Sequence, residues 1–249
     1  MTIVALINQK GGVGKTTSTI NIGAGLAQLG KKVLLVDLDP QAHLTYSLGI
    51  QAHEQKATIY ELLQGGDLGE TIVKRNGLSV IPSTLNLSGA EVELSGVAGR
   101  EFLLKEALSG LKGFDYVLLD CPPSLGLLTL NALTTAGEVY IPLQTEFLAL
   151  QGMTKLLETI EVVKKRLNKE LEITGIIATR YDSRKNLNRE VVEKIQEHFG
   201  DKLFKTLVRD NIALAEAPSF GKTIFEYKAD SNGAEDYLNI CKEILRRKQ

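Results

Sequence analysis

Apolar residues along this chain form short continuous runs that alternate with longer segments of helical spacing. Continuous runs rich in Val, Ile and Leu are typical of parallel strands that are covered on both faces. They predict strands at residues 3–8, 31–41 (apolar at 33–36), 78–83, 114–124, 139–144, 173–182 and 203–208. Apolar positions three or four apart predict helices at residues 15–30, 42–50, 58–65, 86–97, 102–111, 151–166, 188–199 and 236–249. This alternation predicts an α/β fold with a doubly wound, mainly parallel sheet and helices on both faces.

Composition narrows the class of protein and its partners. With 249 residues, 43% of them hydrophobic and 24% charged, the chain predicts one domain over residues 1–249 with a sizeable core. A formal net charge of −1 gives no overall attraction for nucleic acid, so any such binding must use a local basic patch. Cys121 and Cys241 lack metal-ligand spacing, and no apolar run has the length of a signal peptide or membrane span. We therefore expect a reduced, cytoplasmic protein.

The sequence QKGGVGKTT, residues 9–17, lies between the first predicted strand and the first predicted helix. Strand, glycine loop and helix in this order are the setting of a phosphate-binding loop. Glycines let consecutive backbone N–H groups turn toward one anion, and the positive end of the helix dipole points at the same phosphates. Lys15 suits a contact with the β- and γ-phosphates, and the Thr16 hydroxyl suits Mg²⁺, which prefers oxygen ligands. The candidate nucleotide-binding residues are Gly11, Gly12, Val13, Gly14, Lys15, Thr16 and Thr17.

The loop departs from the general motif G-x-x-x-x-G-K-[ST] at its first position, where Gln9 replaces glycine and Lys10 follows. The resulting K-G-G-x-G-K-T resembles the deviant Walker A motif of the ParA/MinD superfamily of ATPases. The resemblance implies a P-loop NTPase fold and a nucleotide-sandwich homodimer in which Lys10 contacts the ATP of the partner subunit. Such a lysine would offset the negative oxygens that two facing ATP molecules bring together. Lys10 and Lys15 are thus candidates for both ATP binding and catalysis.

Two predicted strands end on carboxylates, and ligands bind at the carboxyl edge of open α/β sheets. Asp120 ends the run at 114–124 in a Walker B arrangement, which predicts that it holds a water molecule of the Mg²⁺ shell. Asp37 and Asp39 end the run at 31–41 as D-L-D-P-Q, which resembles the second signature of the family. The resemblance implies that Asp39 orients or deprotonates the attacking water, and that Asp37 lies nearer the metal as a further candidate for contact through water. Taken alone, two such acids could simply form turns.

Two later loops are candidate nucleotide contacts. Two prolines after the Walker B acid force a turn beside the phosphates, so residues 124–131 are a candidate γ-phosphate switch. A proline turn that merely ends the strand is the alternative. Residues 209–224 resemble the late loop of the family that touches adenine and then passes to the dimer face. That resemblance implies a base contact for Asn211. Family members commonly carry proline and arginine just before this asparagine, whereas this chain has Arg209 and Asp210, so Arg209 is a candidate ATP-binding residue only as the occupant of its position.

Basic residues in the second half bear on nucleic acid. The resemblance implies nonspecific DNA binding by the assembled dimer, and Arg184 lies in D-S-R-K-N-L, which is similar to a DNA-contacting segment of the family. A second position that is usually basic in the family is Ala213 here. A few phosphate contacts would give weak, salt-sensitive binding, whereas ordinary solvated charges are the alternative. The candidate DNA-binding residues are Arg180, Arg184, Lys185 and Lys222, with Arg189 and Lys205 as further basic positions.

Motifs in family order cover nearly the whole chain, which most resembles the ParA/Soj branch that partitions chromosomes and plasmids. The resemblance implies Mg²⁺-dependent ATP hydrolysis, an ATP-bound homodimer, nonspecific DNA as a partner, a ParB/Spo0J-like protein that stimulates hydrolysis, and a nucleoid-associated location in the cytoplasm. Residues 236–249 have an apolar face without Trp or Phe, which predicts a core-covering helix and no membrane contact.

Three alternatives remain open from the sequence. A MinD-like division-site regulator would bind membranes, and a ParA-like ATPase for another cellular cargo would share all of this chemistry. An iron–sulfur protein related to nitrogenase reductase would need two suitably placed cysteines at the dimer interface. Cys121 directly follows the Walker B acid instead, which disfavours the iron–sulfur alternative.

Overall fold

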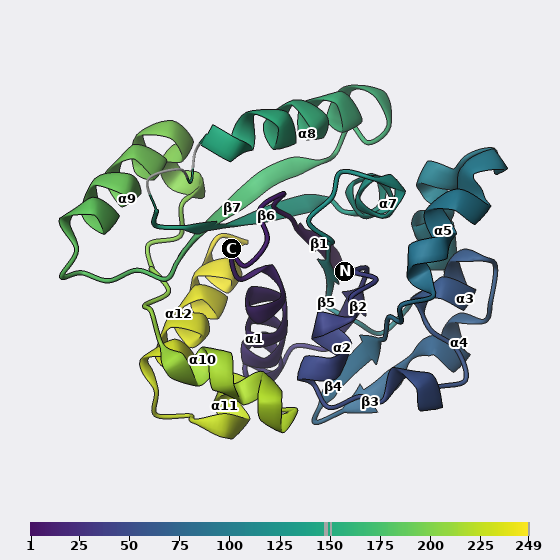
Figure 1. Ribbon diagram of the computed structural model, residues 1–249, viewed down its shortest axis with the longest axis horizontal. Coiled ribbons are helices and arrows are strands. Elements are labelled where there is room, and N and C mark those ends of the chain that lie inside the picture. Colours follow the sequence, from purple (N-terminus) through teal and green to yellow (C-terminus); the bar gives the residue numbers. More distant parts are fainter. Residues whose placement is uncertain (147–148, 150, 249) are drawn as a thin grey trace.

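A computed structural model describes residues 1–146, 149 and 151–248. Within that part of the chain, seven strands form one sheet in the order β3-β4-β2-β5-β1-β6-β7 (Figure 1). They are β1 (Thr2–Leu6), β2 (Val33–Asp37), β3 (Val73–Arg75), β4 (Leu78–Ile81), β5 (Tyr116–Asp120), β6 (Glu138–Gln144) and β7 (Glu172–Thr179). Neighbouring strands are parallel except β3 and β4. The predicted doubly wound, mainly parallel sheet is therefore confirmed.

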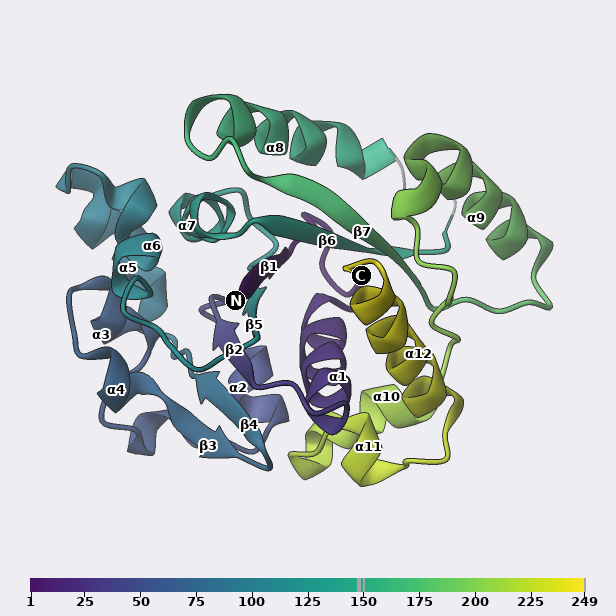
Figure 2. The same ribbon diagram turned by 180° about the vertical axis from the view of Figure 1, so that it is seen from behind.

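Helices cover both faces of the sheet. The helices α1 (Lys15–Gln28) and α12 (Asn232–Arg246) lie side by side on one face (Figures 1 and 2). On the other face lie α7 (Leu127–Thr135), α8 (Thr154–Arg166) and α9 (Asn186–Phe199) (Figures 1 and 2). The shorter helices are α2 (His43–Ser47), α3 (Ile59–Leu63), α4 (Leu68–Thr71), α5 (Leu87–Glu93), α6 (Leu103–Ala107), α10 (Ile212–Glu216) and α11 (Ile224–Tyr227).

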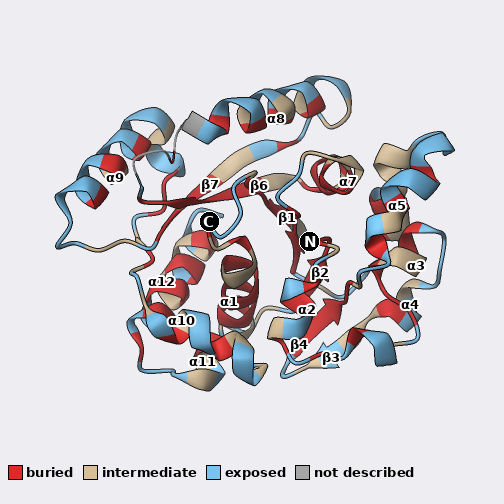
Figure 3. Cartoon of the chain, in the orientation of Figure 1, coloured by how far each residue is buried: buried red, intermediate tan, exposed pale blue. Residues whose placement is uncertain are grey.

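Successive side chains of the central strands enter two different apolar cores. Val4 and Leu6 of β1 belong to the core shared with α1 and α12. Ala5, between them, and Ile7, just after the strand, belong to the core shared with α7 and α8. Figure 3 shows these central strands buried along most of their length. Burial on both faces explains why the strands appear in the sequence as continuous apolar runs rather than as alternating ones.

The C-terminal helix α12 covers the core, as predicted. Tyr237, Ile240, Cys241 and Ile244 on its apolar face are each at most 1% exposed. The face that could have contacted a bilayer is therefore occupied by the protein itself. Among the described residues, no helix combines the length and apolar character needed to cross a membrane.

One predicted strand is wrong, and one observed strand was not predicted. Residues 203–208 run beside β7 but form one isolated bridge to it, between Leu203 and Ile176. In the middle of the segment, the backbone N–H groups of Lys205 and Thr206 donate instead to the Glu243 carboxylate, both at 2.8 Å. A side chain of α12 thus replaces the sheet ladder in the middle of the segment. The antiparallel β3 is only three residues long and partly exposed, so it leaves no apolar run in the sequence.

Gly25 of α1 allows α1 and α12 to approach closely. A Cβ at this position would lie 2.7 Å from the Cys241 sulfur and 3.3 Å from the Phe225 ring. We expect Gly25→Ala to lower the free energy of unfolding by about 1–3 kcal/mol, because overpacking outweighs the gain of about 1 kcal/mol in helix propensity. Denaturant-induced unfolding measures the change.

Gly89→Ala in α5 is the matched control, since a Cβ there would meet only the movable end of the Glu93 side chain. We expect this substitution to be neutral or stabilising. Equal stability of the two variants would contradict the close approach of α1 and α12.

Candidate functional site

The glycine loop lies between β1 and α1, at the carboxyl edge of the sheet. Gly12 and Gly14 have φ values of +73° and +89°, which favour glycine, and Gly14 is the residue that precedes the first turn of α1. The positive end of the α1 dipole therefore lies at the glycine loop, which is the setting that the sequence predicts for a phosphate site. Gly11, Gly12 and Gly14 are the three glycines of the K-G-G-x-G-K-T motif, and all three lie in this loop.

Side chains from the second half of the chain hold this loop in place. The Gln144 amide donates to the Gly12 carbonyl at 2.7 Å, and the Thr179 hydroxyl donates to the Val13 carbonyl at 2.9 Å. Asn8 donates through its side chain to the Pro142 carbonyl at 2.8 Å. Sequence analysis did not single out these residues, although Gln144 and Thr179 are polar ends of apolar strands, which is the same signal that marked the acids.

Lys15 is a buried cation, with only 7% of the residue exposed. Its Nζ donates to the Lys10 carbonyl at 3.3 Å. Burial lowers the pKa of Lys15, and the nearby Asp120 and Asp39 oppose that shift. The ammonium group thus lies under the loop and near the acids Asp120 and Asp39. Its contact with phosphate stays a prediction.

Thr16 and Asp120 meet at the first turn of α1. The Thr16 hydroxyl donates to Asp120 Oδ2 at 2.7 Å, and the Thr19 hydroxyl donates to Asp120 Oδ1 at 3.1 Å. Asp120 is fully buried, and burial together with the charge of Asp37 raises the pKa of Asp120 to about 8. The predicted metal ligands Thr16 and Asp120 are therefore adjacent in the fold.

Asp37 lies beside Asp120, because β2 and β5 pair these two residues in register. The Thr45 N–H and hydroxyl donate to Asp37 Oδ2 at 2.9 and 2.7 Å, and the Asp39 N–H donates to Oδ1 at 3.1 Å. Burial raises the pKa of Asp37 to about 6 despite these hydrogen bonds. The structure thus places two buried carboxylates side by side at the strand ends.

Asp39 lies two residues beyond Asp37, just after the end of β2 and at the same edge of the sheet. The Gln41 N–H donates to Asp39 Oδ1 at 2.9 Å, and 8% of the residue is exposed. This contact forms a turn, so the turn-forming alternative describes part of what Asp39 does. Its position near Lys15 keeps it available for the predicted role.

Lys10 contacts a residue of its own chain. Its Nζ lies 2.9 Å from Glu146 Oε2, and the two side chains are 48% and 52% exposed. The hydrogen bond from Lys10 lowers the pKa of Glu146. Lys10 therefore lies at the surface of the loop, in contrast with the buried Lys15.

A cavity of about 550 Å³ opens beside the glycine loop. Ligand pockets of this size are common in proteins. Asn211, the predicted base contact, lines the cavity, and so does Arg209, the other candidate ATP-binding residue of the late loop. The Arg209 guanidinium, however, lies 2.6 Å from both Asp236 Oδ1 and Glu235 Oε2, so it is already engaged by two carboxylates. The residues that line the cavity are Gly12, Val13, Gly14, Thr17, Thr179, Arg180, Val208, Arg209, Asp210, Asn211, Ile212, Leu214, Ala215 and Tyr237.

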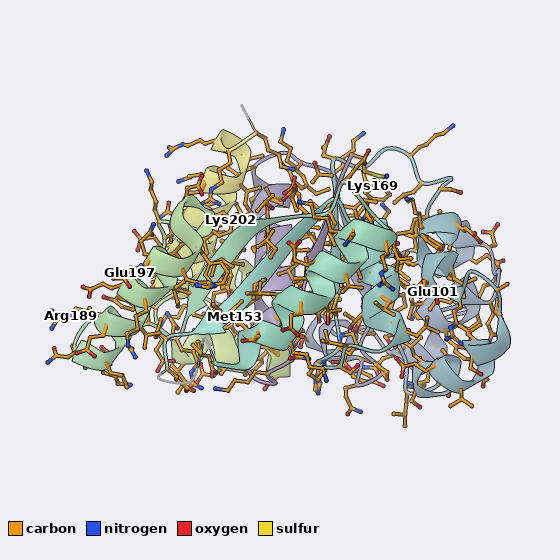
Figure 4. All side chains as sticks on the ribbon, turned by 90° about the horizontal axis from the view of Figure 1, so that it is seen from above. Glu101, Met153, Lys169, Arg189, Glu197 and Lys202 are labelled. Atoms are coloured by element: carbon orange, nitrogen blue, oxygen red, sulfur yellow. The ribbon has the colours of Figure 1, made fainter. Side chains whose placement is uncertain are left out.

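Three of the candidate DNA-binding residues, Arg180, Arg184 and Lys185, lie on the segment between β7 and α9, and Arg180 and Lys185 both lie near enough to Glu146 to lower its pKa. Arg184 and Lys185 lie in the turn before α9, where the Arg184 guanidinium lies 2.9 Å from Asp182 Oδ2. Arg180 also lines the cavity, and Lys222 lines a small cleft beside Thr16 and Thr17. Of the further basic positions, Arg189 projects from α9 away from the sheet, as Glu197 of the same helix does (Figure 4), and Lys205 lies beside α12.

Comparison with known proteins places this geometry in a family. Residues 1–173 match the AAA domain family. The chain is 48% identical over 246 residues to the sporulation initiation inhibitor protein Soj of Bacillus subtilis, with 97% of both sequences covered. It is 44% identical over 253 residues to the chromosome partitioning protein ParA of Caulobacter vibrioides, with 99% of this chain and 95% of that protein covered. The chain belongs to the Soj/ParA family of partitioning ATPases.

Membership of the Soj/ParA family confirms the resemblance drawn from the motifs. Solved structures agree with it: cobyrinic acid a,c-diamide synthase from Mycobacterium smegmatis, crystallised with a bound ATP analog and magnesium, has a TM-score of 0.88 and 38% identity to this chain. That comparison covers 99% of this chain and 95% of the other. The iron–sulfur alternative fits poorly, because Cys121 and Cys241 are buried free thiols.

The two buried acids predict how stability depends on pH. Their pKa values in the folded chain exceed that of an unfolded aspartic acid, so the folded state holds protons that the unfolded state loses above about pH 4. We expect the protein without nucleotide or magnesium to lose stability from about pH 5 to about pH 8, by an amount on the order of 1 kcal/mol or more. Asp120→Asn should remove most of this slope in unfolding experiments.

Asp230→Asn is the control for that experiment, since Asp230 is an exposed residue in the turn before α12. This variant should keep the wild-type slope. A wild-type profile that is flat between about pH 5 and about pH 8 would contradict the raised pKa values.

Proposed function

We propose that this Soj/ParA-family chain binds ATP with Mg²⁺ at the carboxyl edge of its sheet and hydrolyses the γ-phosphate. The observation that carries the proposal is the convergence of the glycine loop, the buried Lys15 and the Thr16–Asp120 pair, whose oxygens lie 2.7 Å apart. A buried ammonium, oxygen ligands and a ring of backbone N–H groups together suit a triphosphate with its metal. The solved relative with an ATP analog and magnesium supports the same ligands.

The oxygen donors at this edge fit Mg²⁺. Thr16 would supply its hydroxyl directly, and Asp120 would hold a water molecule of the metal shell. Asp37 already accepts three hydrogen bonds from protein groups, so it would contact the metal through water at most. When bound, Mg²⁺ would neutralise the charge on the phosphate oxygens and hold them in line for attack. The raised pKa of Asp120 supports this proposal, because a cation at this position would offset the cost of burying the charged carboxylate.

The chain's own side chains would supply the rest of the chemistry. Lys15 would hold the β- and γ-phosphates and offset the charge that develops as the γ-phosphoryl group leaves. Asp39 would orient or deprotonate the attacking water, with one carboxylate oxygen fixed by the Gln41 N–H. Positioning and electrostatics of this kind account for most of phosphoryl-transfer catalysis.

We propose that ATP joins two copies of the chain and that this dimer binds DNA. Lys10 would then leave Glu146 and contact the ATP of the partner subunit. Arg184, Lys185 and Lys222 would contribute weak, salt-sensitive phosphate contacts, and release would follow hydrolysis. A ParB-like protein would stimulate that hydrolysis on the nucleoid, in the cytoplasm. The partitioning names of the relatives support this assignment.

Two other functions share the nucleotide chemistry. A MinD-like membrane regulator needs an exposed apolar helix, whereas the apolar face of α12 is buried against α1. A ParA-like ATPase that positions another cargo would differ only in the partner that stimulates it. Binding to lipid vesicles in the presence of ATP would identify a MinD-like regulator. Identification of the stimulating partner would distinguish an ATPase that positions another cargo.

Replacement of Asp39 tests the water-placing role. We expect Asp39→Ala to keep ATP binding but to lower hydrolysis roughly 10²-fold or more, because the water loses its orienting base. ATP-bound dimer should therefore accumulate on DNA, as sizing and DNA-retention assays with and without ATP would show. Lys15→Ala is the comparison, since it should bind no ATP and form no dimer. If Asp39→Ala neither accumulates dimer nor remains longer on DNA, the role is wrong.

Replacement of Lys10 tests the contact between subunits. Its ion pair with Glu146 is half exposed and contributes little to the monomer, so Lys10→Ala should bind ATP within a factor of about five of wild type. Dimerisation should be lost, because the facing phosphates would lack a cation. Analytical ultracentrifugation with ATP measures both states. Lys56→Ala, which removes an exposed lysine paired with Glu70, is the control and should dimerise normally.

A further inference from the structure

Arg180, at the end of β7, has a strained backbone. Its φ of +54° lies in the left-handed region, which arginine rarely adopts. Neighbouring hydrogen bonds fix this conformation: the Tyr181 N–H donates to the Val208 carbonyl at 3.0 Å, and the Thr145 hydroxyl donates to the Arg180 carbonyl at 3.2 Å. Strain of this kind persists where the surrounding structure imposes it, and such residues cluster at binding sites. Here it brings Arg180 to the cavity beside the glycine loop.

The two arginines that line this cavity differ in how firmly they are held. Arg209 donates to Asp236 and Glu235 and is committed to α12. Arg180 has one long ion pair, with its Nε 3.7 Å from Asp210 Oδ1, and these two side chains are 59% and 53% exposed. An exposed pair at this distance is weak, so a ligand can separate it at little cost. Arg180 is therefore the guanidinium of the cavity that is available to a ligand.

The cavity has a phosphate end and an apolar end. Gly12 and Gly14 lie at the first, at the positive end of the α1 dipole. Val208, Ile212 and Leu214 line the rest, and Ile212 is 77% exposed. A nucleotide with its phosphates on the loop would rest its base and ribose against these apolar side chains. A guanidinium can stack on a planar base or donate hydrogen bonds to its acceptor atoms.

We infer that Arg180 binds the nucleoside part of the bound nucleotide, with Asp210 releasing the guanidinium as the nucleotide enters. This assignment rests on the proposed ATP binding and deepens it, because it names a specificity-determining residue. It also replaces a role in DNA binding for Arg180. The contact lies on the nucleoside, which ATP and ADP share, so it stabilises both nucleotides equally.

Two substitutions of Arg180 test the assignment. Arg180→Ala removes the guanidinium but keeps the strained backbone, whereas Arg180→Gly removes it and relieves the strain. We expect both to weaken binding of a nonhydrolysable ATP analog and of ADP about tenfold each, which corresponds to one charged contact. Titration calorimetry with Mg²⁺ measures the affinities. Thermal unfolding should show Arg180→Gly at least as stable as wild type, so a loss of binding cannot come from misfolding.

Arg166→Ala is the matched control, because Arg166 is an exposed arginine in the last turn of α8 that lies outside the cavity. Its affinity for both nucleotides should stay within about twofold of wild type. At saturating nucleotide, the Arg180 variants should remain on DNA as wild type does. If the wild-type protein binds both nucleotides and both Arg180 variants bind them with the same affinity, the role of Arg180 is wrong but the proposed ATP binding stands. A wild-type protein that takes up neither nucleotide would overturn the proposed function as well.

Discussion

Two buried carboxylates at neighbouring strand ends are the constraint on which this structure depends. Asp37 and Asp120 are paired in register by β2 and β5 and are fully buried. Burial raises the pKa of both carboxyl groups, and the charge of Asp37 raises the pKa of Asp120 further. Hydrogen bonds from Thr16, Thr19 and Thr45 contact their oxygens, yet the pKa values stay raised, so these bonds do not offset the cost of charging both groups. The arrangement is costly without a cation, because like charges in a low dielectric repel. A bound metal–nucleotide complex would therefore stabilise the protein, because its cation would offset the repulsion between these two buried carboxylates.

The glycine loop depends on the second half of the chain as much as on its own glycines. Gln144 and Thr179, at the ends of β6 and β7, donate hydrogen bonds to the Gly12 and Val13 carbonyls and so hold the loop in its conformation. The AAA domain match ends at residue 173, before Thr179 and before the late loop that lines the cavity. The region that would distinguish nucleotides is thus built largely from the part of the chain beyond that match.

Local patterns predicted the strands, the loop and the acids because each is determined within a few residues. Asp37, Asp39 and Asp120 follow apolar runs directly, so their shared edge follows from a parallel sheet. The failures involve distant partners. In residues 203–208, backbone N–H groups bond to Glu243 instead of to a neighbouring strand, and Arg209 pairs with Asp236. These partners lie far away in the sequence, so no local pattern predicts the contacts. The parts of the site that the backbone positions could therefore be predicted from the sequence. The parts that depend on which of several distant partners a side chain contacts could not.

The two lysines of the loop show how position decides what a charge can do. Lys15 is buried under the loop, and a buried ammonium group without a partner is costly. It can therefore bind only a ligand that enters the site of its own subunit. Lys10 is half exposed, and its pair with Glu146 is worth about 0–1 kcal/mol, so exchanging that carboxylate for another anion costs little. The proposed contact of Lys10 with a second subunit requires a cation that can change partners in this way. The weak pair to Glu146 keeps Lys10 ordered near the loop while leaving it free to change partners.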